Sequence, residues 1–188
     1  GVNTDMLFQV DGPSGVSTVI VNEKGDYRSI IISGVNRAIT EQLCYVKIPS
    51  DASVLLLQNE IPDTANRQCL AMAREAGVRT ILNAAPFRSM DRSVLEIVDI
   101  IVMNCIEARD FLALAEPEAG TCDLASRLAD HYGPDTILTA GIEGVYHCRR
   151  GAIRHFPPHR VKVSNSLGAG DAFIGGLAHG LDQGIEME

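Results

Sequence analysis

Apolar and polar segments alternate along most of the chain and predict strands and helices in turn. From residue 53 onward, short and continuously apolar runs are separated by segments with helix-type boundaries, such as Pro62 before one segment and Gly77 at its end. Such apolar runs are typical of strands buried in a parallel sheet. Strands are predicted over residues 53–58, 78–85, 99–104 and 135–141. Helices are predicted over residues 63–77, 91–98, 106–115, 122–133 and 168–184.

Two hairpins and a short helix complete the predicted elements. Residues 16–33 are rich in β-branched residues on both sides of a polar turn, and residues 144–158 turn at Arg150-Gly151. A short helix is predicted over residues 39–47. The alternation of strand and helix predicts an α/β fold with a doubly wound, mostly parallel sheet flanked by helices. The first hairpin is predicted to be a separate β flap on this sheet domain.

Composition narrows the classes of function without choosing one. The formal net charge of the 188 residues is −8, which argues against a nucleic-acid partner because such a surface needs a basic stripe. No apolar run reaches the roughly 18 residues of a membrane span. The five cysteines are scattered and form no C-x-x-C pair, so we expect neither a zinc site nor disulfides, and we expect a cytoplasmic location.

The stretch NSLGAGDAF at residues 165–173 is the most informative local feature. The small residues Gly168, Ala169 and Gly170 let the backbone approach a ligand, and the helix that follows offers free amides and about half a unit of positive charge. These features predict an anion site suited to a phosphate. Asp171 beside that site either takes a proton from a nucleophile or stabilises the helix dipole, and the stretch alone favours neither.

Polar residues directly after the predicted strands form a second group of candidates. Ligands of open α/β sheets bind at the carboxyl ends of the strands, where Asn59, Glu60, Asn83, Asn104 and Glu107 stand. The segment from Gly141 to Gly144 follows the fourth strand in the same way. Turns also require Asn and Gly, so these positions fit a ligand site and a structural role equally well.

Several motifs together resemble those of the ribokinase-like, pfkB-type carbohydrate kinases. NSLGAGDAF is similar to the family's signature Asp-Thr-x-Gly-Ala-Gly-Asp-x-Phe, and GVNTD at 1–5 followed by residues 13–40 resembles the family's lid. The family's further segments are resembled, in the family's order, by LLLQNEIP at 55–62, LNAAPFR at 82–88, Asn104-x-x-Glu107 and ILTAGIEGVY at 137–146. The resemblance implies a β lid region over residues 1–36 and an α/β kinase core over residues 37–188.

The resemblance also implies a reaction, which is transfer of the ATP γ-phosphate to a sugar hydroxyl. Asp171 would be the catalytic base, with the backbone from Leu167 through Gly168, Ala169 and Gly170 as the anion hole. Glu60 would bind the sugar, together with Asp171. The nucleotide would contact Asn104, Thr139, Gly141 and Gly144. Glu107 would hold Mg²⁺, through water, near the ATP phosphates.

Departures from the family pattern leave three questions open. Asn165 stands where the family has Asp in a monovalent-cation site, which puts potassium activation in doubt. The family's first strand, its Gly-Gly sugar segment and its last helices have no counterpart here, so the chain is expected to be a fragment. A module that binds nucleotide or sugar without turnover, and a kinase for another acceptor such as a nucleoside, are the alternatives. A homodimer through the lid is a further expectation of the resemblance.

Overall fold

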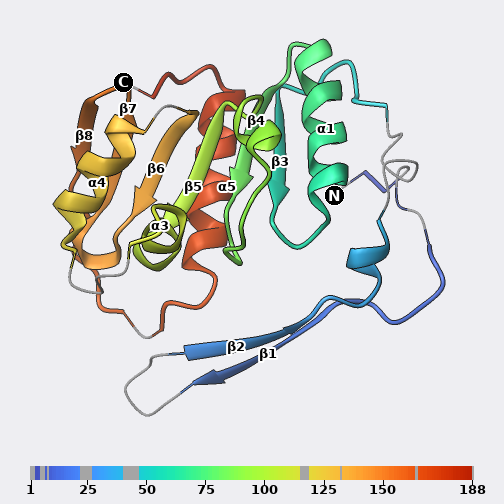
Figure 1. The fold of residues 1–188 in the computed structure, drawn as a ribbon, viewed down its shortest axis with the longest axis horizontal. Helices are drawn as coiled ribbons and strands as arrows, with labels where there is room; N and C mark the ends of the chain where they lie inside the picture. The colour runs from blue at the N-terminus through green and yellow to red at the C-terminus, as the bar shows by residue number, and fades with distance from the viewer. Residues whose placement is uncertain are drawn as a thin grey trace.

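The computed structural model describes residues 3–4, 7, 9–21, 27–39, 47–114, 119–131, 133–163 and 165–187. Within these residues the strands form two sheets, one with two strands and one with six. Figure 1 shows the larger sheet with its helices as the body of the molecule and the two-stranded hairpin below it.

The six-stranded sheet is parallel over its first four strands and antiparallel over its last two. The strands lie in the order of the sequence, so each pairs with the next one along the chain. They are β3 (Val54–Gln58), β4 (Arg79–Asn83), β5 (Ile100–Asn104), β6 (Asp135–Thr139), β7 (Val145–Arg149) and β8 (Ala152–Phe156). The predicted α/β class, with a mostly parallel sheet flanked by helices, is confirmed.

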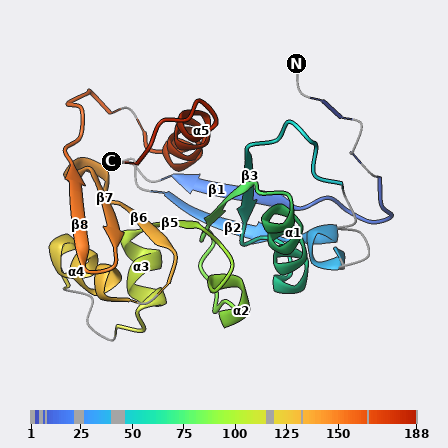
Figure 2. The same cartoon turned by 90° about the horizontal axis from the view of Figure 1, so that it is seen from above.

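Helices cover both faces of this sheet, but unequally. One face carries α1 (Asp63–Glu75), α2 (Arg92–Leu95), α3 (Cys105–Phe111) and α4 (Thr121–Asp130). The other face carries α5 (Ala169–Asp182), as Figure 2 shows. Parallel strands that are added in one direction by right-handed crossovers bring their helices to the same face. The chain reaches the second face only after the antiparallel hairpin of β7 and β8.

Each face of the sheet buries its own apolar cluster. Neighbouring residues of a strand point to opposite faces, so Leu82 packs in the cluster under α1 to α4 while Ile81 packs in the cluster under α5. Both side chains are completely buried. On the second face, Ile174 of α5 packs in one buried cluster with Val102 and Ile137. The continuously apolar strand runs therefore reflect burial on both faces.

Local signals set several helix boundaries as expected. The first helix begins after Pro62, and at its end Gly77 has a positive φ of 70°. The amide of Val78 donates to the carbonyl of Ala73 at 2.8 Å, which closes the last turn. The helix predicted over residues 106–115 ends earlier, at Phe111, because Ala113 turns to a φ of 52°.

The hairpin predicted over residues 16–33 is confirmed as β1 (Val16–Val21) paired with β2 (Tyr27–Ile32). A short 3-10 helix, η1 (Gly34–Ala38), follows it, and the amide of Val35 donates to the carbonyl of Pro13 at 3.0 Å. The helix predicted over residues 39–47 lies almost wholly outside the described residues. Within the described part of the hairpin, Ile20, Ile30 and Ile32 expose more than half of their surface.

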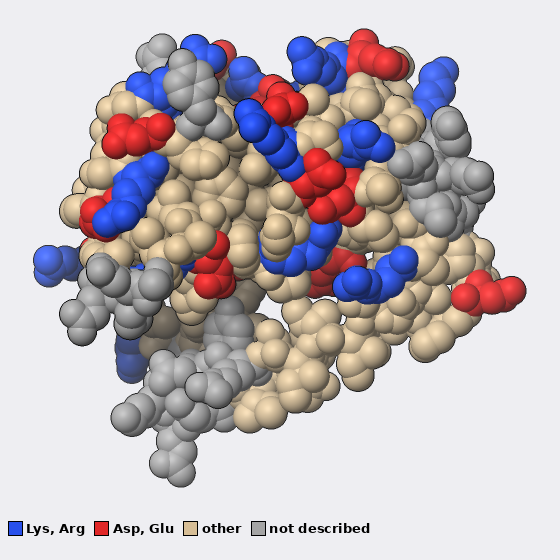
Figure 3. Space-filling view, viewed as in Figure 1, with Lys and Arg blue, Asp and Glu red and all other residues tan. Residues whose placement is uncertain are grey.

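Charged side chains are spread over the surface of the body. In the view of Figure 3, Lys, Arg, Asp and Glu are interspersed over its helices. No helix in the described part of the chain is long and apolar enough to cross a membrane. Below the body, the hairpin lies at the edge of the sheet where the parallel strands end (Figure 1).

Candidate active site

Most of the candidate residues lie at one edge of the sheet. Gln58 pairs with Asn83, Asn83 with Val102 and Asn104 with Thr139, so the carboxyl ends of the four parallel strands lie within two residues of one another. Glu60 follows the first of these ends and Glu107 lies in the first turn of α3, directly after the third. Gly141 and Gly144 belong to the short turn between β6 and β7. The strand register thus places these positions at one edge of the sheet.

The amino end of α5 lies at the same edge. The far end of this helix is fixed by Asp182, whose carboxylate accepts a hydrogen bond from the Ser53 hydroxyl just before β3. Since α5 has 14 residues and rises about 1.5 Å per residue, it spans the height of the sheet. The helix thus runs from the carboxyl edge of the strands to their amino edge, as Figure 1 shows. Gly168 and Asp171 consequently lie at the carboxyl edge of the sheet, as Glu60 does.

The entry into α5 leaves backbone amides open to a ligand. Gly168, at the N-cap, has a φ of 77°, a left-handed conformation that glycine adopts without strain. The amide of Leu167 donates to the Asn165 side chain at 3.2 Å, and that of Ala169 donates to Ser166 at 3.1 Å. The amides of Gly168 and Gly170 have no acceptor among the described residues. Two of the four amides proposed for the anion hole are thus engaged in the turn itself.

Asp171 and Asn165 flank these amides. Asp171 lies in the first turn of α5 and is exposed to solvent. Its side chain has no hydrogen bond or ion pair with another described residue. The Asn165 side-chain oxygen accepts the Leu167 amide, so it stabilises the turn before the helix whether or not a cation binds there.

Asn104 and Glu107 form a capping box at the start of α3. The Asn104 side-chain oxygen accepts from the amides of Ile106 and Glu107 at 2.8 and 3.0 Å, and Glu107 Oε2 accepts from the Asn104 amide at 2.8 Å. This arrangement satisfies three amides that a helix start leaves unpaired. The pair predicted for nucleotide and metal therefore has a structural role as well, which the resemblance did not indicate.

Glu107 is the carboxylate in this part of the site. Its exposed fraction is 9%, and burial raises its pKa above the ordinary range, opposed by the hydrogen bond from the Asn104 amide. The described residues contain no cluster of three or more His, Cys, Asp or Glu that could enclose a metal. Mg²⁺ is often held by one or two carboxylates, with water and substrate phosphates as the other ligands. A single oxygen ligand such as Glu107 fits that mode of binding.

The turn after β6 combines three predicted nucleotide contacts. The Thr139 hydroxyl donates to the Met103 carbonyl at 3.4 Å, and Gly141 is exposed with a φ of 55°. Gly144 has a φ of 88°, and a Cβ placed there would lie 2.2 Å from the Phe156 carbonyl oxygen. Gly144 is therefore required for packing against β8. Gly141 faces open space, which leaves its surface free for a ligand.

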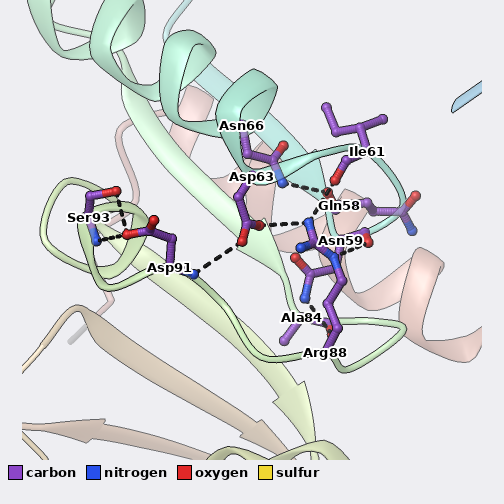
Figure 4. A network of polar contacts seen from close by, with 9 residues as sticks. All are labelled: Gln58, Asn59, Ile61, Asp63, Asn66, Ala84, Arg88, Asp91 and Ser93. Carbon is purple, nitrogen blue, oxygen red and sulfur yellow. Dashed lines mark hydrogen bonds and ion pairs between the residues drawn. The ribbon is translucent and has the colours of Figure 1, made fainter. Parts of the chain in front are cut away.

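Glu60 stands in a turn whose backbone is held by a residue that the sequence did not single out. The Arg88 guanidinium donates from Nε to the Asn59 carbonyl at 3.0 Å and from Nη2 to the Ile61 carbonyl at 2.7 Å. Figure 4 shows these bonds on either side of position 60. The only trace of this contact in the sequence is the place of Arg88 two residues after the Asn-x-Ala-Pro segment, which does not reveal its partners.

The comparisons with known proteins agree on one family. The pfkB family of carbohydrate kinases matches the chain over residues 1–188. The ribokinase of Mus musculus is 28% identical over 184 residues, covering 94% of this chain and 57% of that protein. The ribokinase of Lactococcus lactis is 30% identical over 168 residues, covering 86% of this chain and 52% of that protein. The chain thus spans just over half the length of these curated relatives.

A solved structure shows the same fold. The ribokinase of Arabidopsis thaliana, in complex with ribose and ATP, superposes with a TM-score of 0.77 and covers 94% of this chain and 59% of its own. Its sequence identity to this chain is 22%, a level at which the superposition speaks for the fold alone.

Proposed function

This chain belongs to the pfkB family of carbohydrate kinases, and from that premise we propose that the protein transfers the γ-phosphate of ATP to a hydroxyl group of a sugar. The observation that carries the proposal is the start of α5. There the amides of Gly168 and Gly170, which have no acceptor in the described part of the chain, stand beside Asp171 at the edge that also carries Glu60 and Glu107. Phosphoryl transfer requires mostly positioning and stabilisation of charge, which such an arrangement supplies.

Asp171 is the proposed general base. As the sugar oxygen attacks the γ-phosphorus, the carboxylate takes the hydroxyl proton, the new O–P bond forms, and the bond to the β-phosphate oxygen breaks to release ADP. Support comes from the exposure of Asp171 and from the lack of a competing partner in the described part of the chain. A base that is free of internal bonds can reach the substrate without first breaking one.

The amides of Gly168 and Gly170 are the proposed donors for the charge on the transferred group. Gly168 precedes the first turn of α5 and Gly170 lies in it, where the helix adds a partial positive charge. Preformed donors of this kind stabilise a developing negative charge without reorganisation during the reaction. A side chain at Gly168 would strain the left-handed backbone that orients the first of these amides.

Glu107 is the proposed anchor for Mg²⁺, with Asn104, Thr139 and Gly141 beside the nucleotide. The ion, when bound, neutralises charge on the phosphates of ATP. Glu107 contributes a carboxylate whose orientation is fixed by the Asn104 amide. Potassium activation at Asn165 is not part of the proposal, because a neutral Asn stands where the family has Asp.

Glu60 is the proposed contact for the acceptor sugar, and the hairpin of β1 and β2 is the proposed lid over it. Support for the lid is its place below the carboxyl edge of the sheet (Figure 1). A lid at that place would exclude water from the phosphoryl group during its transfer. Pairing of two lids in a homodimer would cover the exposed Ile20, Ile30 and Ile32.

The test measures sugar-dependent ATP turnover in the whole protein, with ribose and other sugars and with a nucleoside as acceptors. We expect turnover with a sugar, and the Asp171→Asn variant should lose about 10²- to 10⁴-fold in kcat. Calorimetric titration should still detect ATP binding to that variant. Binding of sugar and ATP without product would contradict the proposal and favour the binding module, and turnover with the nucleoside alone would reassign the acceptor.

A further inference from the structure

The turn that carries Glu60 is unusually well fixed for a surface loop. Three of its backbone carbonyls accept side-chain hydrogen bonds, those of Gln58, Asn59 and Ile61. Asn66 of α1 donates to the first at 3.0 Å, and Arg88 donates to the other two. The backbone on both sides of position 60 is therefore held from two different elements.

Glu60 itself has a fixed backbone and an unengaged side chain. Its carboxylate makes no hydrogen bond or ion pair with any residue that the structure describes. A carboxylate with open oxygens on a fixed backbone is available to a ligand. Groups that must bind a ligand are held by their neighbours while their own polar atoms stay open.

Arg88 suits this task because of the shape of its side chain. The planar guanidinium offers donors in a rigid fork, so one residue can reach the two carbonyls that flank position 60. Its charge is balanced by Asp63, the first residue of α1, with Nη2 and Oδ1 at 2.7 Å. Asp63 Oδ2 in turn accepts the Asp91 amide at 3.2 Å, which fixes the carboxylate from the far side, as Figure 4 shows.

The floor of the turn is equally constrained. Asn59 is 2% exposed, and its side chain donates to the Ala84 carbonyl at 3.4 Å. The amide of Asn59 donates to the Ala85 carbonyl, also at 3.4 Å. These bonds join the end of β3 to the segment after β4, which is the segment that carries Arg88. Loss of Arg88 would therefore leave these bonds in place and release only the Asn59 and Ile61 carbonyls, which flank Glu60.

We propose that Arg88 is a positioning residue for the acceptor site, which holds the backbone on both sides of Glu60 so that the Glu60 carboxylate meets a hydroxyl of the acceptor. This inference rests on the proposed function and extends it to a residue that does not itself touch the substrate. Displacement of a binding group by about 1 Å is enough to reduce the rate about 100-fold. The loss should appear in the use of the acceptor and spare the use of ATP.

The experiment compares Arg88→Met with Arg88→Lys in the whole protein, and the matched control is Arg92→Met. Arg92 forms an ion pair with Glu96 on α2 and its side chain is 90% exposed. We expect Arg88→Met to lower kcat/KM for the sugar about 10- to 100-fold while KM for ATP stays within about twofold. Arg88→Lys should recover part of the loss, since the ammonium group can pair with Asp63 but cannot span both carbonyls. Arg92→Met should match the unaltered protein.

A double-mutant cycle with Glu60→Ala separates positioning from a general structural role. If Arg88 acts through Glu60, Arg88→Met should change kcat/KM for the sugar less than about twofold once Glu60 is Ala. Effects that multiply in full, or an equal rise in KM for ATP and for sugar, would overturn the positioning role while leaving the kinase proposal intact. If the unaltered protein turns over no sugar, the proposed function fails and the role of Arg88 fails with it. Should Arg88→Met not fold, the same cycle is read with Arg88→Lys.

Discussion

Two glutamates at the same edge of the sheet are held in opposite ways. Glu107 is almost completely buried and its carboxylate is bonded to the Asn104 amide three residues away. The Glu60 carboxylate has no partner among the described residues, and the backbone around it is held by Arg88, which is 28 positions further along the chain. The first arrangement is a local cap and the second is a long-range clamp. The difference indicates that one region orients its functional group through helix formation and the other through tertiary packing.

The turn from Gly141 to Gly144 allows local structure and tertiary packing to be compared within four residues. It is also where we expect the largest change in stability. Gly144→Ala places a Cβ 2.2 Å from the Phe156 carbonyl on another strand, whereas Gly141→Ala meets no atom within 4 Å. Both positions have a positive φ, so both variants carry backbone strain. We expect Gly144→Ala to lower the free energy of unfolding by about 3 kcal/mol or more and Gly141→Ala by about 1–2 kcal/mol, measured by urea denaturation. Equal losses would mean that packing against β8 does not constrain this turn.

Asn104→Ala probes the local cap directly. The substitution removes the acceptor of the Ile106 and Glu107 amides, so the free energy of unfolding should fall by about 1–2 kcal/mol. Asn104→Asp is the matched control, because a carboxylate accepts the same bonds and suits the positive end of the helix. If the Ala and Asp variants are equally stable, the capping box contributes nothing and the contrast with the clamp disappears.

The parts of the site that could be predicted are those whose residues lie close together in the sequence. The Asn-x-x-Glu spacing and the glycines before Asp171 act within one turn of helix, and the sequence displays them together. The strand ends could be expected to meet because parallel strands share an edge. The contacts of Arg88 depend on how the segment after β4 folds over the segment after β3, and no short pattern records this. The bond from Ser53 to Asp182, which orients α5, joins positions even further apart.

Glu60→Ala tests the other side of the comparison, through stability. Since the Glu60 carboxylate has no partner in the described part of the chain, its removal should change the free energy of unfolding by less than about 0.5 kcal/mol. In the same protein preparation, KM for the sugar should rise about 10-fold or more, because a charged hydrogen bond to the acceptor is lost. A clear loss of stability would show that Glu60 serves the fold, and it would remove the reason for treating the two glutamates differently.

The pH dependence of Glu107 gives the smallest expected effect, because Glu107→Gln keeps an acceptor for the Asn104 amide. Burial raises the pKa of Glu107 above its ordinary value of 4.5, so near that pH the folded state binds more protons at this site than the unfolded state. The contribution of Glu107 to stability is then fully present below its unfolded pKa and is lost as the pH rises through its folded pKa.

We therefore expect the free energy of unfolding of Glu107→Gln to increase relative to that of the unaltered protein as the pH rises from about 4 to about 7. Urea denaturation of both proteins across this range measures the difference. A constant difference, or one that moves in favour of the unaltered protein, would mean that the hydrogen bond from the Asn104 amide outweighs burial, and Glu107 would then be a carboxylate stabilised by its cap.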